Sequence, residues 1–222
     1  MAIAFFSEAL KKAGFRHGFS TRLASPEEVG ALVGVPFEAI TRAKQVHSAR
    51  VIEAEHAGLV ADEADALVSR SAFAVAIQTA DCVPILIADL RVGAVAAVHA
   101  GWRGVVSGIA PNAIDFLGGD ASNLVAAIGP CICGTCFEVG ADVAEKIATA
   151  TDSAVIVRRA GEKAFVDLRI AVRTQLVRAG IPDANIEDVA GCTYHQNDLF
   201  FSYRREGANA GRLIAVIEPK TL

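Results

Sequence analysis

The fold is decided by one stretch of the chain, which reads Gln78-Thr79-Ala80-Asp81-Cys82-Val83-Pro84-Ile85-Leu86-Ile87-Ala88-Asp89-Leu90-Arg91-Val92-Gly93-Ala94-Val95-Ala96-Ala97-Val98-His99-Ala100-Gly101-Trp102-Arg103-Gly104. It contains two short apolar runs, Val83–Ala88 and Val92–Val98, and their β-branched residues favour strands over a helix. Because the polar break between the runs is short, the two strands are expected to form an antiparallel hairpin.

Two reactive side chains, Cys82 and His99, flank this hairpin at its open end. Folding the chain about Leu90 and Arg91 places them opposite each other, although a bulge near Gly93 would shift the register by about one residue. Three interpretations are open: a structural pair in the core, a Cys–His nucleophile pair, or two ligands of a transition metal.

The residues around this pair also have the chemistry of a binding site. The two glycines of Gly101-Trp102-Arg103-Gly104 allow the backbone to approach a ligand closely. A helix is expected over Val105–Leu117, kinked at Pro111, so Arg103 would lie near a helix N-terminus, which favours an anion. Asp81 either caps a turn or orients a ligand.

The composition bounds the class of protein. The chain has 222 residues, 53% of them hydrophobic, and no linker divides it, so we expect a single domain over residues 1–222. The formal charge of −4 argues against nucleic-acid binding, and the lack of an 18-residue apolar span argues against a membrane helix. Five cysteines without a signal peptide indicate a reduced, cytoplasmic setting.

The remaining elements follow from apolar periodicity and caps. Ser25, Pro26 and Gly34 bound a predicted helix. A strand over Ala43–Val51 would carry Gln45 and His47 on the same face. Other strands are expected over Phe73–Gln78, Leu124–Ile128, Ile186–Val189 and Leu213–Ile217, and helices over Val139–Ala150 and Leu168–Ala179.

Three cysteines, Cys131, Cys133 and Cys136, lie within six residues. Since neither a second Cys-x2-Cys nor a His pair accompanies them, we do not expect a closed four-ligand zinc site. Buried thiols lining a loop are the expected arrangement, with Cys131 as a weaker alternative nucleophile. The polar and aromatic segment Cys192–Gly207, which contains His195, forms either a pocket wall or an aromatic corner.

The motifs of this chain resemble, from about Gly14 to Ile217, the YfiH/YlmD family. This family is also called the multicopper polyphenol oxidase (laccase) family, and its members include purine nucleoside phosphorylases and peptidoglycan editing factors. The resemblance rests on Gln45-Val46-His47, Thr79-Ala80-Asp81-Cys82-Val83-Pro84, His99-Ala100-Gly101-Trp102-Arg103-Gly104, Gly129-Pro130-Cys131-Ile132, Phe137-Glu138-Val139-Gly140, and Cys192-Thr193 through Phe201-Ser202-Tyr203-Arg204-Arg205.

The resemblance implies a fold, a cofactor and an activity. The implied fold is α+β: a mixed β-sandwich flanked by helices, akin to the catalytic domain of cytotoxic necrotising factor. The implied cofactor is a catalytic Zn²⁺ held by His47, Cys82 and His99. The implied activities are phosphorolysis of adenosine, inosine, guanosine or methylthioadenosine, and hydrolytic deamination of adenosine, so the partners are a nucleoside and phosphate.

We assign further roles as hypotheses. Arg103 and Arg22 are the candidates for binding phosphate, and Gln45 and His195 are candidates for base or ribose contacts. One departure from the family affects Arg22: the Gly-Gly-Val-Ser-like turn and the Asn-Leu-Gly segment that usually follow it are missing here, so the substrate contacts of that segment are not carried over to this chain.

Three alternatives remain. A Cys- or zinc-dependent hydrolase acting on peptidoglycan precursors would use Cys82 with His99. A copper polyphenol oxidase holding Cu²⁺ needs many histidines, and this chain has five. A zinc-stabilised binding module is disfavoured by an open coordination position beside Arg103.

Overall fold

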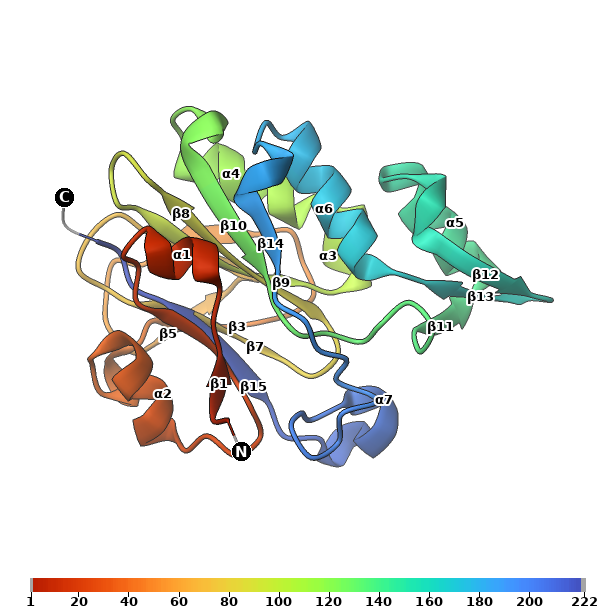
Figure 1. Ribbon diagram of the computed structural model, residues 1–222, viewed down its shortest axis with the longest axis horizontal. Coiled ribbons are helices and arrows are strands. Elements are labelled where there is room, and N and C mark those ends of the chain that lie inside the picture. Colours follow the sequence, from red (N-terminus) through yellow and green to blue (C-terminus); the bar gives the residue numbers. More distant parts are fainter. Residues whose placement is uncertain (1, 221–222) are drawn as a thin grey trace.

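The structure, a computed structural model that describes residues 2–220, is built around the predicted hairpin. Strands β8 (Val83–Asp89) and β9 (Val95–Ala100) pair antiparallel at its centre (Figure 1). Pro84, rather than Cys82, lies opposite His99, so the predicted register is wrong by two residues.

The turn between the two strands explains the register. The Asp89 N–H donates to the Ala94 carbonyl (2.8 Å) and the Gly93 N–H donates to the Asp89 carbonyl (3.0 Å), so the loop has four residues and is not centred on a two-residue turn. The Asp89 carboxylate accepts hydrogen bonds from the N–H groups of Arg91 and Val92. Gly93 has φ of +74°, a conformation that glycine adopts at little cost.

The hairpin forms the middle of a six-stranded mixed sheet with the order β14-β10-β8-β9-β6-β4. Its other strands are β4 (Val51–Glu53), β6 (Ala66–Ser69), β10 (Leu124–Ile128) and β14 (Ile186–Asp188). The pairs β10–β14 and β4–β6 are parallel, and the others are antiparallel. Every residue of β8 and β9 is buried, because both faces of the sheet are covered.

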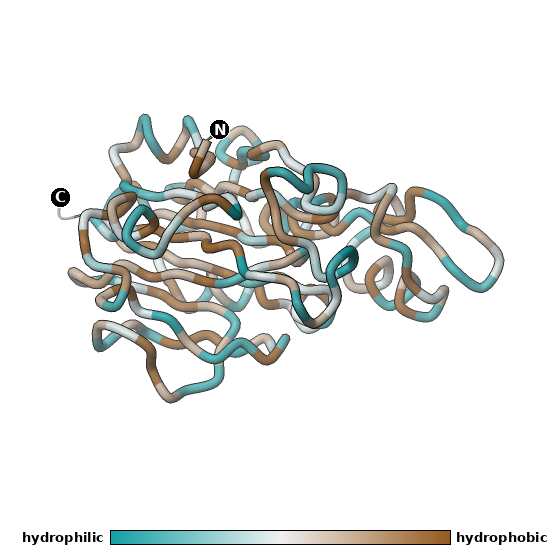
Figure 2. Tube along the Cα trace, turned by 90° about the horizontal axis from the view of Figure 1, so that it is seen from below, coloured by the Kyte–Doolittle hydropathy of each residue, from teal (hydrophilic) through white to brown (hydrophobic). Residues whose placement is uncertain are grey.

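A second sheet packs on one of these faces. Its strands, in the order β1-β2-β15-β7, are β1 (Ala4–Phe5), β2 (His17–Ser20), β15 (Leu213–Ile217) and β7 (Val75–Thr79). The core between the sheets combines Leu86 and Val95 with Ile77 and Ile217, and each such buried side chain contributes about 1.5–3 kcal/mol. Figure 2 shows hydrophobic segments running along the stacked strands of the body.

Helices cover the outer faces of both sheets. Helices α3 (Trp102–Val106), α4 (Ile109–Leu117) and α6 (Leu168–Arg178) pack on the six-stranded sheet, and α2 (Pro26–Val33) packs on the four-stranded sheet (Figure 1). The short helix α1 (Glu8–Lys12) lies against β10. This mixed α+β sandwich flanked by helices confirms the predicted fold class.

Smaller elements surround the sandwich. A three-stranded sheet of β11 (Glu138–Gly140), β13 (Lys163–Val166) and β12 (Ile156–Ala160) projects with α5 (Ala141–Ala150) at one end of the molecule (Figure 1). Strands β3 (Arg42–Lys44) and β5 (Leu59–Glu63) form a parallel pair, and α7 (Tyr203–Glu206) is a single turn. Short 3-10 turns occur at Phe37–Ala39, Ala121–Asn123, Ser153–Val155, Asp183–Asn185 and Gly207–Asn209.

Two local predictions are corrected. The strand expected over Ala43–Val51 ends with β3, and residues 45–50 form a loop in which His47 has φ of +61°. The single kinked helix expected over Val105–Leu117 is two helices separated at Gly108, where φ is +78°. Pro111 lies in the first turn of α4, where its missing N–H would have no helical partner anyway.

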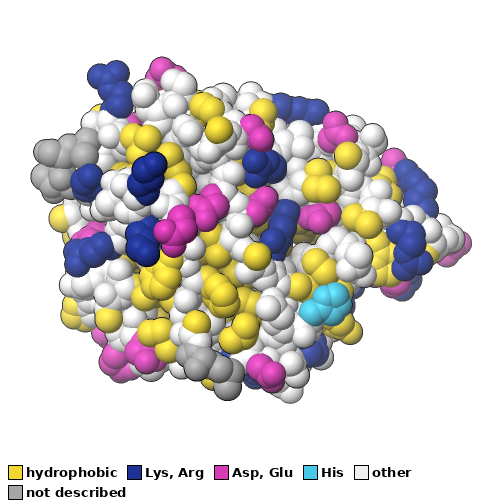
Figure 3. All heavy atoms as spheres, in the orientation of Figure 1, with side chains coloured by type: hydrophobic (Ala, Val, Ile, Leu, Met, Phe, Trp, Pro, Cys, Tyr) yellow, Lys and Arg dark blue, Asp and Glu magenta, His cyan; other side chains and the backbone are white. Residues whose placement is uncertain are grey.

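The surface carries both signs of charge. On the face drawn in Figure 3, basic and acidic side chains are interspersed. None of the helices within residues 2–220 combines the length and the apolar character that crossing a membrane requires.

Candidate metal centre

The three residues predicted to bind zinc lie together. His47 comes from the loop between β3 and β4, Cys82 directly precedes β8, and His99 is on β9; one ligand atom of each lies within 4.8 Å of the others. The Cys82 Sγ is 3.9 Å from the His47 Nε2, and the two imidazole rings meet edge to face with centroids 4.9 Å apart. We call these residues the His–Cys–His site; their role as metal ligands remains a prediction.

Asp65 orients both histidines, although sequence reasoning did not select it. Its carboxylate is completely buried and accepts a hydrogen bond from His99 Nδ1 (2.8 Å), which leaves His99 Nε2 free as a ligand atom. The same carboxylate accepts hydrogen bonds from the N–H groups of Val46, His47 and Ser48. Those bonds hold the loop in the left-handed conformation that His47 adopts. The available signal was an acidic residue directly before the apolar run 66–68.

Asp81 connects two segments that are distant in the sequence. Its carboxylate accepts hydrogen bonds from the Thr193 hydroxyl and the Arg204 N–H, both at 2.6 Å. Asp81 therefore ties the segment before β8 to the chain around residues 193–204. The backbone at Asp81, with φ of +91°, makes the turn that exposes Cys82 to the cavity.

The apo site favours a Cys82 thiolate beside a protonated His99, so a metal ion that binds there must displace the proton on His99 Nε2. Burial alone would raise the pKa of the Cys82 thiol, but hydrogen bonding to His47 and His99 outweighs burial and lowers this pKa to about 6. Burial opposes the charged forms of Asp65 and His99 as well. The hydrogen bonds from His99 and Ser48 nevertheless lower the pKa of Asp65 to about 2. The contacts of His99 with Asp65 and Cys82 raise the pKa of His99 to about 9. A thiolate is the form in which cysteine binds a metal.

Gly101 leaves room for these ligands. A Cβ atom at this position would lie 2.9 Å from His47 Cδ2 and 3.1 Å from Cys82 Sγ. The first glycine of the segment after His99 is therefore required by close packing against the side chains of the site.

The His–Cys–His site opens into a cavity of about 870 Å³. This volume lies within the usual range for a small-molecule site. Its basic lining residues are Arg42, Lys44, Arg103, Arg204 and Arg212, and its apolar and aromatic ones include Leu59, Ile132, Phe137 and Tyr203. A cavity with this lining offers cationic groups for an anion and aromatic rings for a planar base.

The structure brings together only some of the predicted substrate residues. Arg103 lines the cavity, where its guanidinium stacks on Trp102 at 4.5 Å. Gln45 also lines it, but both ends of its amide bond the backbone of Gln78. Arg22 is not among the lining residues: its guanidinium lies over a phenylalanine ring and donates to a backbone carbonyl at 2.6 Å.

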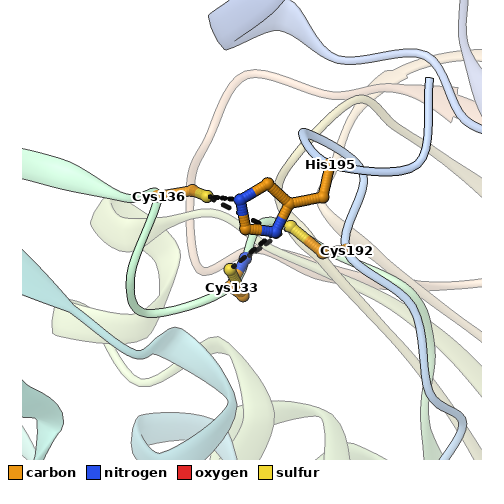
Figure 4. Close-up of side chains that lie close together, drawn as sticks. All are labelled: Cys133, Cys136, Cys192 and His195. Atoms are coloured by element: carbon orange, nitrogen blue, oxygen red, sulfur yellow. Dashed lines mark hydrogen bonds between the residues drawn. The ribbon is translucent and has the colours of Figure 1, made fainter.

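His195 is also absent from the cavity lining, and its position corrects a prediction about the cysteines. Cys133, Cys136, Cys192 and His195 each bring one ligand atom within 4.8 Å of the others (Figure 4). From the sequence, Cys131, Cys133 and Cys136 were not expected to form a closed zinc site, because no second Cys-x2-Cys or His pair accompanies them. The Cys-x2-His spacing of residues 192–195, which supplies the other two members of the group, was not considered. We call these four residues the Cys3His cluster.

Cys131 is separate from the cluster and unsuited to be a nucleophile. Its side chain is completely buried, and this burial, offset only in part by Arg169, raises the pKa of its thiol to about 12. The Arg169 guanidinium donates to the Cys131 sulfur at 3.1 Å. The alternative of Cys131 as a nucleophile therefore lacks both access and a thiolate.

Comparison with known proteins agrees with this fold. A family model described as multi-copper polyphenol oxidoreductase laccase matches residues 24–220. The chain belongs to this family. It is 39% identical over 204 residues to adenosine deaminase RL5 from an unknown prokaryotic organism, a match that covers 85% of this chain and 78% of that protein.

Other members of this laccase family carry a different activity in their names. A purine nucleoside phosphorylase of Deinococcus radiodurans is 37% identical over 193 residues, covering 85% of this chain and 74% of that protein. The crystal structure of the hypothetical protein YfiH of Bacillus licheniformis superposes with a TM-score of 0.88 at 24% identity, covering 99% of this chain and 97% of that one. The predicted resemblance to the YfiH family is therefore confirmed.

Proposed function

We propose that this protein is a zinc-dependent enzyme that phosphorolyses purine nucleosides and also deaminates adenosine. The observation that carries the proposal is the convergence of two imidazoles and one thiol at the base of a basic cavity. The family's relatives named as phosphorylase and deaminase support the same substrate class.

The donor set fits zinc. One thiolate and two imidazoles are ligands that zinc accepts in a tetrahedral shell, and three protein ligands leave a fourth position for solvent or substrate. Zinc bound there would supply Lewis acidity and a water of lowered pKa. A multicopper centre would need more histidines than this cavity offers. Of the chain's five histidines, His17 bonds Phe15 and Ser7 in the core, and His195 belongs to the Cys3His cluster.

Arg103 is the residue best suited to bind phosphate. Within the described residues its guanidinium has no hydrogen-bonded or ion-paired protein partner, and stacking on Trp102 holds it at the cavity. By contrast, the guanidinium groups of Arg204, Arg42 and Arg212 donate to backbone carbonyls and contribute mainly positive charge. Five free donors in a planar group match the geometry of a phosphate.

The two reactions share one cavity but differ in the attacking group. In phosphorolysis a phosphate oxygen bonds to the ribose C1′ while the bond from C1′ to the purine nitrogen breaks, and the purine leaves with a proton. In deamination water adds at C6 of adenosine and ammonia leaves. The Phe137 and Tyr203 rings offer stacking surfaces for the purine in either case. The side-chain amide of Gln45 bonds the backbone of Gln78 and so fixes the part of the cavity wall that these two residues form.

The test is a product assay with purified protein. Adenosine, inosine, guanosine and methylthioadenosine are each incubated with and without phosphate. We expect free base and sugar phosphate only when phosphate is present, and inosine from adenosine without it. Cys82→Ala should abolish both reactions. The proposal fails if no nucleoside is converted, or if Cys82→Ala remains fully active after metal removal.

A second candidate is a cysteine hydrolase acting on peptidoglycan precursors. The contact of 3.9 Å between the Cys82 thiol and His47, with His99 beside them, also fits a nucleophile and its base. This activity would survive chelation of zinc and would be blocked by thiol alkylation, whereas the metal-dependent reactions would be lost on chelation.

A further inference from the structure

We propose that Cys133, Cys136, Cys192 and His195 bind a second zinc ion, which has a structural role and ties the cavity-lining loop that carries Phe137 to the loop that carries Cys192 and His195. This site is distinct from the His–Cys–His site and does not depend on the proposed reaction. It requires only that the cysteines are reduced, and all five cysteines of the chain are free in the structure.

The sheet brings the two halves of the cluster together. Strands β10 and β14 are parallel neighbours, with Ile128 paired to Asp188, and the pairing continues as an isolated bridge between Cys131 and Cys192. Each strand is followed by a loop, and the two loops therefore leave the same edge of the sheet side by side. One loop carries Cys133 and Cys136, and the other carries Cys192 and His195 (Figure 4).

Each loop folds into a tight turn that points its two ligands the same way. The N–H groups of Cys136 and Phe137 both donate to the Cys133 carbonyl (2.9 and 3.0 Å), and the Gln196 N–H donates to the Cys192 carbonyl (3.0 Å). The Cys133 N–H also points to the Cys192 sulfur at 3.4 Å. A spacing of two residues between paired ligands is typical of structural zinc sites.

The distances agree with four ligands around one ion. With His195 Nδ1 as the ligand atom, the Cys133 Sγ lies 3.9 Å and the Cys136 Sγ 3.8 Å from it. Zinc–sulfur and zinc–nitrogen bonds in a tetrahedral shell place sulfur and nitrogen about 3.5 Å apart. Three soft sulfur donors and one imidazole fill such a shell, leaving no vacancy, so the site is structural rather than catalytic.

The cluster is connected to the cavity at several points. Phe137, which lines the cavity, directly follows Cys136, and the Arg204 guanidinium donates to the Cys136 carbonyl at 3.3 Å. Thr193, between Cys192 and His195, donates to Asp81 next to Cys82. An ion in the cluster would therefore fix the wall that Phe137 and Arg204 form. The nearby guanidinium also offsets the negative charge of three thiolates.

The test is zinc stoichiometry in matched variants. Protein is loaded with zinc under reducing conditions, freed of unbound metal and measured by elemental analysis. We expect two zinc ions per chain in the wild type and in Cys131→Ala, the control for the cysteine outside both sites. We expect one in Cys136→Ser and one in Cys82→Ala. His195→Cys, which preserves four soft ligands, should keep two.

Cobalt substitution provides a second readout, which is taken first on the wild type. The cluster offers three thiolates and the His–Cys–His site one, so the wild type should show intense thiolate-to-cobalt charge-transfer absorption that Cys82→Ala largely retains. The inference is overturned if wild type and Cys136→Ser hold equal zinc, or if copper fills the cluster. One ion that Cys82→Ala keeps and Cys136→Ser loses would support the cluster and overturn the His–Cys–His site instead.

Discussion

Asp65 determines the geometry of the His–Cys–His site, because its buried carboxylate bonds both histidine-bearing segments. It fixes the His99 ring by accepting a hydrogen bond from Nδ1, and it holds the backbone of residues 46–48, including His47, by accepting hydrogen bonds from the three N–H groups. A carboxylate that orients a histidine ligand typically strengthens metal binding by about 10–100-fold. The geometry of the two histidine ligands therefore depends on a residue that is itself not one of the three predicted ligands.

We expect Asp65→Asn to weaken zinc binding at this site about 10–100-fold, because an amide cannot accept all of these hydrogen bonds. A competition titration with a coloured chelator measures the change. Asp62→Asn is the matched control, since Asp62 is exposed and its carboxylate pairs with Arg50 and, among the described residues, with none of the predicted ligands. Equal affinities of Asp65→Asn and wild type would contradict the assigned role.

Gly101→Ala tests how tightly the site is packed. The new Cβ would lie 2.9 Å from the His47 ring and displace it. We expect turnover to fall on the order of 100-fold while circular dichroism and the melting temperature change little. Gly140→Ala is the control, because its Cβ would meet only the Asp142 side chain, which can rotate away. Unchanged turnover in Gly101→Ala would show that the ring has space to move.

At the scale of elements, the turn between β8 and β9 fixes the register that sequence reasoning missed. Apolar runs identified both strands, but the position of the turn depended on hydrogen bonds of the Asp89 side chain and on the chain end. The Gly93 carbonyl accepts a hydrogen bond from the Lys220 N–H at 2.9 Å, a contact across 127 residues of sequence that no local pattern reveals. The prediction of one helix over Val105–Leu117 was also wrong, because the helix is interrupted at Gly108 and not at Pro111.

We expect Gly93→Ala to destabilise the protein more than Gly161→Ala. Both glycines have positive φ, +74° and +61°, so each alanine costs about 1 kcal/mol in backbone strain. Only at Gly93 would the Cβ also clash, 1.8 Å from the Lys220 carbonyl oxygen, which adds about 1–3 kcal/mol. Urea unfolding measures both losses. Equal losses would mean that the chain end does not brace the turn.

At the scale of the whole molecule, the sites arise from contacts between segments distant in sequence. The hairpin and the family motifs predicted His47, Cys82 and His99, because two of them flank one local element. The Cys3His cluster needs β14 to lie parallel to β10, and a single sequence does not reveal that pairing. Its spacing signal was nevertheless present in residues 192–195.

His17 and Glu187 link the two sheets through the start of α1, and they make stability depend on pH. The His17 ring, 3% exposed, accepts a hydrogen bond from the Ser7 N–H and donates one to Phe15. Burial lowers the pKa of His17 below 6.5, although Glu187 and Glu8 act in the opposite direction. The Glu187 carboxylate accepts hydrogen bonds from Ser7 and the first N–H groups of α1; despite burial, these bonds lower its pKa below 4.5.

Both pKa values are lower in the folded state, so the unfolded chain binds more protons as the pH falls and stability is lost. The free energy that neutral His17 contributes to folding is complete above about pH 6.5 and declines as the pH falls toward the pKa of His17 in the folded protein. The total loss is about 1.4 kcal/mol for each unit by which folding lowers this pKa. We therefore expect the stability difference between wild type and His17→Gln, measured by urea unfolding, to be constant above neutral pH and to shrink below pH 6.5. His56→Gln, at an exposed histidine, should follow the wild-type curve. A difference that grows on acidification would mean that His17 is charged in the folded protein and that its hydrogen bond with Ser7 runs in the opposite sense.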